Sequence, residues 1–123
     1  MKVVKIVSPQ FHAALMKLSN QELPLGSAKI VFSTVRTVKE LTEDYHNGRI
    51  EFMSKLAEQN EDGTPKLDEK DNFILSDEVV PAINEKLKEM LSKEIEIKTI
   101  PLVDLGDAKL SAQEFSLLEE LFV

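Results

Sequence analysis

The sequence predicts a mainly helical α+β domain, built from a long helical hairpin, short flanking helices and a small two- or three-stranded sheet. Two helical patterns, Ser27–Gln59 and Asp77–Ser92, are separated by the polar, turn-rich block Asn60–Asn72. The first pattern has 33 residues, and at ~1.5 Å per residue it would be about 50 Å long, more than one small core requires. We therefore expect a single domain, residues 1–123, with a projecting hairpin tip at about residues 60–75.

The composition is that of a globular domain, and we expect it to be located in the cytoplasm. The chain has 123 residues, of which 42% are hydrophobic, and no cysteine, so disulfides and thiolate chemistry are excluded. No apolar run is long enough for a membrane span. Residues 1–39 contain six basic residues and one acidic residue, whereas the remainder contains nine basic and twenty-one acidic residues. Direct binding of the acidic part to nucleic acid or an anionic membrane is not expected.

The N-terminal residues predict a strand followed by a short helix. Lys2–Val7 is rich in β-branched residues, which favours a strand. Ser8 offers an N-cap oxygen and Pro9 suits the first helical position, so a helix is expected to about Leu18. Its apolar face would consist of Phe11, Ala14, Leu15 and Leu18.

The long helix is predicted from an apolar stripe that begins after Ser27, a possible N-cap. The dipeptide Asn47-Gly48 could split the helix, but the stripe keeps its phase across it, which favours continuity. The helix cannot extend past Pro65. The stripe consists of Val31, Val35, Val38, Tyr45, Phe52 and Leu56.

The second half of the chain predicts a tip, a helix, a strand and a final helix. The tip is either a small β-hairpin, Thr64–Leu67 against Phe73–Leu75, or irregular. Asp77 could cap the next helix, with Pro81 in its first turn. The alternating segment Glu94–Ile100 predicts a strand, which we expect to pair with Lys2–Val7. The capping box Ser111–Glu114 predicts the start of the final helix. The apolar residues are Val80, Ile83, Leu87, Met90 and Leu91 in the helix after Asp77, and Phe115, Leu118, Leu121 and Phe122 in the final helix.

No residue pattern predicts catalysis, a cofactor or a metal. The local motifs of common hydrolases, nucleotide binders and zinc sites are missing. His12 and His46 lie in different predicted helices, and the tip carboxylates do not have the spacing of an EF-hand loop. Asp104 and Asp107 are better explained as turn residues than as an acid–base pair. We therefore expect a protein that is not an enzyme.

One constellation suggests a binding surface. Opposite the apolar stripe, a helix would align the acidic residues Glu40, Asp44, Glu51 and Glu58, together with Asn47 and Ser54. We call these four acidic residues the acidic ridge. A solvated helix face explains it most simply, and a contact surface for a basic groove of another protein is the functional interpretation.

The order of elements resembles that of small acidic proteins of tailed bacteriophages and prophages, many without an assigned function. The shared patterns are Leu23-Pro24, the long helix, Asn60-Glu-Asp-Gly-Thr-Pro, Asp71-Asn-Phe, Glu94-Ile-Glu-Ile, Leu110-Ser-Ala-Gln-Glu-Phe and Leu117-Leu-Glu-Glu. The resemblance implies a viral, intracellular origin and supplies no active-site residues. Asn47-Gly48 departs from the unbroken helix of this pattern.

The expected function is that of a non-enzymatic phage accessory protein in the host cytoplasm, which binds and inhibits a host or phage protein through the acidic ridge. Two alternatives stay open. The chain could be a virion or assembly component whose apolar stripe continues into a homo-oligomeric interface. It could also be a small enzyme whose site is formed only in the fold.

Overall fold

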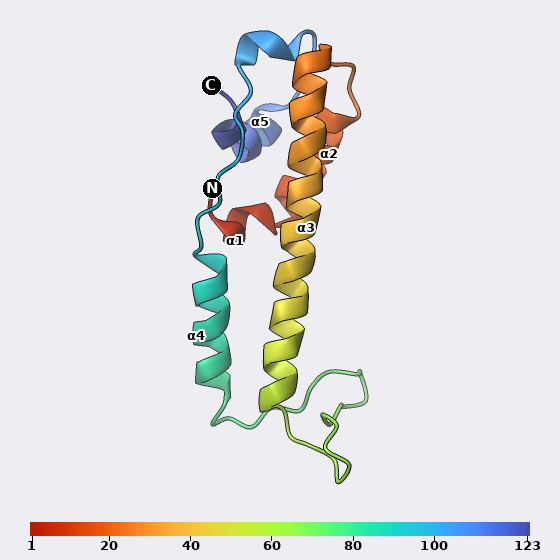
Figure 1. Ribbon diagram of the computed structural model, residues 1–123, viewed down its shortest axis with the longest axis vertical. Coiled ribbons are helices and arrows are strands. Elements are labelled where there is room, and N and C mark those ends of the chain that lie inside the picture. Colours follow the sequence, from red (N-terminus) through yellow and green to blue (C-terminus); the bar gives the residue numbers. More distant parts are fainter. The chain divides into compact units, whose positions relative to one another are not determined.

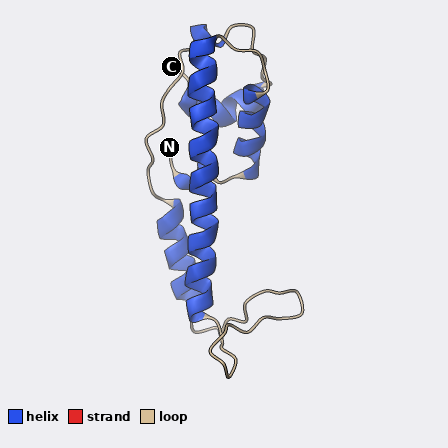
Figure 2. Cartoon of the chain, turned by 45° about the vertical axis from the view of Figure 1, so that its right-hand side comes forward, coloured by secondary structure: helices blue, strands red, loops and turns tan.

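The computed structural model describes residues 1–123 and contains helices but no strands (Figure 2). The prediction of an α+β fold with a small sheet is therefore wrong, and the fold is all-α. The chain divides into two compact units, residues 1–42 with 93–123 (unit 1) and residues 43–92 (unit 2). The elements are α1 (Val3–Ile6), α2 (Pro9–Ser19), α3 (Leu25–Leu56), α4 (Val80–Leu91), the 3₁₀ turn η1 (Leu102–Leu105), α5 (Ala112–Leu118) and the 3₁₀ turn η2 (Glu119–Leu121).

The N-terminal segment that was expected to be a strand forms the single helical turn α1. Val3 and Ile6 lie three residues apart, and the turn buries both side chains. The predicted pairing of this segment with Glu94–Ile100 is nevertheless correct at one point, because Lys2 and Glu94 form an isolated antiparallel bridge. Burial of one face of a turn thus outweighed the β propensity of the sequence.

Residues 94–100 are extended, as the alternation predicts, but they do not form a sheet. The N–H of Ile95 donates to the carbonyl of Met1 (2.9 Å), and the N–H of Ile100 donates to that of Leu121 (2.7 Å). Ile95 and Ile97 pack against the core of unit 1. Only the isolated bridges Lys2–Glu94 and Ile100–Phe122 form, because each neighbouring segment pairs with the extended residues at a single position.

The core of unit 1 is formed by α1, α2, α5, the N-terminal part of α3 and the C-terminal residues (Figure 1). The cap of α2 is as predicted, since the hydroxyl of Ser8 accepts from the N–H of Phe11 (3.2 Å) and Pro9 is the first helical residue. The core residues are Ile6, Phe11, Ala14, Leu15, Leu18, Val31, Val38, Ile100, Leu118, Leu121 and Phe122.

Helix α3 is continuous through Asn47-Gly48, as the phase of the stripe predicts. Within unit 2, a Cβ on Gly48 would lie 3.1 Å from Cε of Met90, so glycine permits the close approach of α4. The expected cap at Ser27 is wrong: the helix begins at Leu25, and the buried hydroxyl of Ser27 donates to the carbonyl of Asp104 instead.

The tip of unit 2 is irregular. Three backbone segments meet there: the N–H of Glu58 donates to Ile74 (2.9 Å), that of Lys66 to Glu58 (2.7 Å), and that of Ile74 to Lys66 (3.1 Å). Leu67 and Phe73 form one isolated bridge, and the N–H of Asp68 donates to the carbonyl of Asn72 (2.8 Å), so the two segments of the possible hairpin pair over a few residues without forming strands. Helix α4 begins at Val80, so Asp77 is not its cap.

The capping box of α5 is confirmed. The hydroxyl of Ser111 accepts from the N–H of Glu114 (3.1 Å), and the N–H of Ser111 donates to the Glu114 carboxylate (2.8 Å). The ammonium of Lys17 on α2 donates to the same carboxylate (2.7 Å). The hydrogen bonds from Lys17, which has the largest effect, and from the N–H of Ser111 lower the pKa of Glu114 from 4.5 to about 2.

Acid should therefore weaken the contact between α2 and α5. Because the pKa of Glu114 is lower in the folded state, its stabilisation is complete above about pH 4.5 and is lost as the pH falls towards 2. We expect Glu114→Gln to lower the melting temperature at pH 6 and to have little effect near pH 2. Melts of both proteins followed by circular dichroism test this, and an equal difference at both pH values would contradict it.

Candidate partner-binding surface

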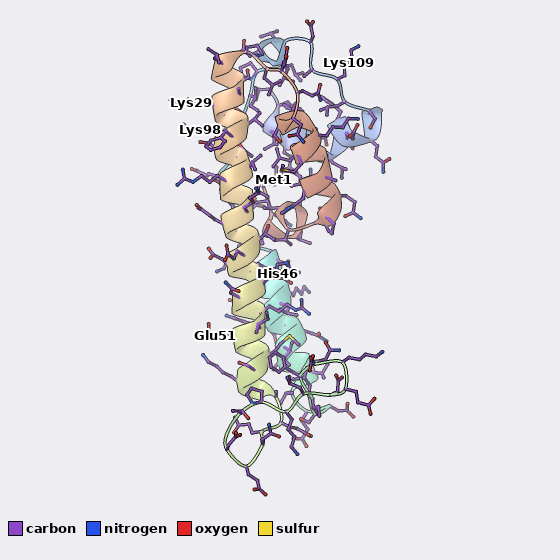
Figure 3. All side chains as sticks on the ribbon, turned by 90° about the vertical axis from the view of Figure 1, so that its right-hand side faces the viewer. Met1, Lys29, His46, Glu51, Lys98 and Lys109 are labelled. Carbon is purple, nitrogen blue, oxygen red and sulfur yellow. The ribbon has the colours of Figure 1, made fainter.

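The structure places the four residues of the acidic ridge in different surroundings. Glu40 belongs to unit 1, whereas Asp44, Glu51 and Glu58 belong to unit 2. All four are exposed. Figure 3 shows Glu51 on the side of α3 away from α4. Glu58 lies beyond the last residue of α3, so its place on the predicted helix face is not realised, and the backbone of the tip holds it instead.

Two residues of the ridge are paired within α3. Arg36 lies 3.7 Å from Glu40, and Lys55 lies 3.2 Å from Glu51, both at i,i+4 spacing. These side chains are about two-thirds exposed or more, and such pairs contribute only ~0–1 kcal/mol. Asp44 and Glu58 form no salt bridge. A basic partner could therefore compete with Arg36 and Lys55 at little cost and meet Asp44 and Glu58 directly.

The net charge of the chain resides in unit 2. Residues 43–92 contain thirteen acidic and six basic residues, a net charge of −7, and the rest of the chain contains nine of each. The division into units thus separates a neutral body from an acidic one, which the division at residue 39 in the sequence did not reveal. A concentrated charge of one sign favours encounter with an oppositely charged partner.

The candidate catalytic and metal-binding residues do not converge. Nε2 of His12 lies 3.0 Å from the hydroxyl of Thr42, and exposed His46 lies beside the ring of Tyr45. No group of three or more histidine, aspartate or glutamate residues could hold a metal ion. Asp104 and Asp107 are both exposed.

The tip aspartates serve as turn residues. The Asp62 carboxylate accepts from the hydroxyl (2.6 Å) and the N–H (3.0 Å) of Thr64, and these two contacts lower its pKa. The Asp68 carboxylate accepts from the N–H groups of Lys70 and Asn72. Their oxygens thus stabilise the local backbone.

Two surface features of unit 1 were missed from the sequence. A hollow of about 250 Å³ lies between α2 and α3, and one of about 580 Å³ lies along residues 94–98 beside Met1. The first combines Met16 of α2 with Phe32 of α3. Each residue alone looks like an ordinary helix residue in the sequence, and only their juxtaposition makes a groove.

No protein-family model matches the chain, and no curated protein or solved structure matches it either. None of the helices combines the length and the hydrophobicity that a membrane span requires.

Proposed function

We propose that the chain is a non-enzymatic accessory protein that binds a basic surface of a protein partner through the acidic face of unit 2, by which we mean Asp44 and Glu51 on α3 together with Glu58 just beyond its end. The observation that carries this proposal is the concentration of the whole net charge in unit 2, with Asp44, Glu51 and Glu58 exposed. In line with the resemblance to small phage proteins, the proposed partner is a host or phage protein, which binding would inhibit by covering a functional basic groove.

The physical argument rests on the state of these carboxylates. Asp44 and Glu58 are exposed and form no ion pair, so no neighbouring cation engages either carboxylate. Glu51 is held only by the exposed Lys55. Their charges are therefore available to an incoming cation, and long-range attraction of this kind acts mainly on the association rate.

Reversal of the acidic face should abolish this binding. In the triple variant Asp44→Lys, Glu51→Lys and Glu58→Lys, the net charge of unit 2 changes from −7 to −1. We expect the affinity for the partner to fall by at least about 100-fold, chiefly through slower association. The partner would first be captured from an infected host lysate with the tagged wild-type protein, and its binding would then be measured by surface plasmon resonance.

A matched control separates the face from the total charge. Glu61→Lys, Glu69→Lys and Glu85→Lys change three exposed acidic residues of the same unit and give the same net charge of −1. This control should retain most of the affinity. If both triple variants lose binding equally, total charge rather than this face is responsible; unchanged affinity of the first variant, with its helix content intact, would refute the proposal.

A further inference from the structure

An apolar groove in unit 1 lies between α2 and the N-terminal part of α3. His12, near the start of α2, contacts Thr42, whereas Ser19, at its end, lines the groove with Ala28. The two helices are therefore antiparallel. The groove has a volume of about 250 Å³, and its apolar lining is formed by Met16, Leu23, Ala28, Val31, Phe32 and Val35.

The groove exposes large apolar side chains. Of the residues that line it, Phe32 is 68% exposed and Met16 is 38% exposed. Leu25, which precedes Phe32 by seven residues on α3 and lies outside the lining, is 89% exposed. Burying apolar surface contributes ~25 cal/mol per Å². A cluster of exposed apolar side chains at a groove is typical of an interaction site.

The shape of the groove is fixed before any partner binds. Gln21 lines it, and its side-chain amide donates to the carbonyl of Lys109 (2.7 Å) while its oxygen accepts from the N–H of Lys109 (2.6 Å). These two bonds hold the chain between α2 and α3 in place. A partner would consequently lose little affinity to reorganisation of the groove.

The size of the groove favours a side chain over a small molecule. At about 250 Å³ it is smaller than the ~300–1,000 Å³ of drug-sized ligand sites. A groove between two helices that offers apolar contacts suits an amphipathic helix, which inserts side chains spaced three or four residues apart.

The charges around the groove specify the partner further. Residues 25–39 of α3 include three basic residues and no acidic one. Arg36 lies four residues after Phe32, and Lys39, which forms no salt bridge, lies four residues after Val35. Arg36 is paired only with exposed Glu40. A helix docked in the groove would thus meet positive charge next to its apolar contacts.

We propose that this groove binds an acidic amphipathic helix of a partner protein. An apolar side chain of that helix enters the hollow beside Phe32, and its acidic residues face Arg36 and Lys39. A second copy of this chain, docked by the same face, would bring like charges together and fits less well. This site is distinct from the acidic face of unit 2, so the two surfaces together would make the protein an adaptor.

Selection from a random library of 16-residue peptides, displayed against the immobilised full chain, tests the proposal. Peptides that also bind a Phe32→Lys variant are removed. We expect the remaining sequences to have apolar residues at i and i+3 or i+4 and an excess of aspartate and glutamate. Failure to enrich any wild-type-specific sequence, or enrichment of sequences without acidic residues, would overturn the proposal.

Binding of a selected peptide, labelled with a fluorophore, then assigns the residues. Phe32→Lys should weaken it by at least about tenfold, and Lys39→Glu should weaken it in a salt-dependent manner. Ile50→Lys is the matched control, because Ile50 is also an exposed apolar residue of α3 but lies in unit 2; its variant should bind normally. A dimer that depends on Phe32 in sedimentation velocity would show that a second copy occupies the groove, and the proposal would fall.

Discussion

Replacing Val38 by aspartate is expected to destabilise unit 1 strongly. Val38 is 1% exposed and lies in the core, where no basic side chain is buried with it. A carboxylate there would be unpaired, and substitutions of this kind belong to the class that destabilises by more than ~4 kcal/mol. Because whole domains are stabilised by only ~5–15 kcal/mol, this substitution should remove a large part of the stability and lower the urea midpoint sharply at pH 7.

The pH dependence identifies the cause. Burial raises the pKa of a carboxyl group, so the destabilisation by Val38→Asp should be larger at pH 7 than at pH 4, where the group is closer to its neutral form. Urea unfolding followed by circular dichroism at both pH values measures this. Phe32→Asp, the same new residue at an exposed position of the same helix, should leave the unfolding midpoint nearly unchanged.

Two results would contradict this expectation. An unchanged midpoint would mean that Val38 is not in a stabilising core. A folded protein whose oligomers had dissociated would instead assign the apolar stripe of α3 to an interface between copies, which is the virion or assembly alternative. Sedimentation velocity of the wild-type and variant proteins distinguishes these outcomes.

The helices whose ends are set by neighbouring residues could be predicted from the sequence. Ser8 and Pro9 define the start of α2, and Ser111 with Glu114 defines the start of α5. In both cases the cap is formed within three residues, so the chemistry is visible in a short window. The phase of an apolar stripe likewise predicted that α3 continues through Gly48.

Elements that depend on distant contacts could not be predicted. The β-branched run after Met1 became α1 because helical burial of Val3 and Ile6 was available. Ser27 resembles a cap, but its hydroxyl finds the carbonyl of Asp104, 77 residues away. Propensity acts locally and is weak, whereas packing depends on residues that the sequence does not place side by side.

The candidate surfaces also contain residues whose position is set by local sequence and residues whose position is set by distant contacts. The exposure of Asp44 and Glu51 followed from helical phase alone, whereas Glu58 lies beyond the helix end and its position depends on the tip. The pairing of Met16 with Phe32 in one groove required the antiparallel packing of α2 on α3. No local pattern contains that information, because the two residues come from different helices.

Replacing Phe11 by alanine should destabilise unit 1 by ~3–5 kcal/mol, the usual cost of deleting a buried aromatic side chain and leaving a cavity. Phe11 is fully buried on α2, and its ring belongs to the core. Phe115→Ala on α5 is the matched comparison. Phe115 is 40% exposed and stacks on Phe122 with ring centroids 5.6 Å apart, so its loss should cost less than that of Phe11, because less of its surface is buried in the folded state. Urea midpoints of the two variants measure the difference. Equal costs would contradict this expectation, because they would mean that the partly exposed Phe115 contributes as much to the stability of unit 1 as the buried Phe11.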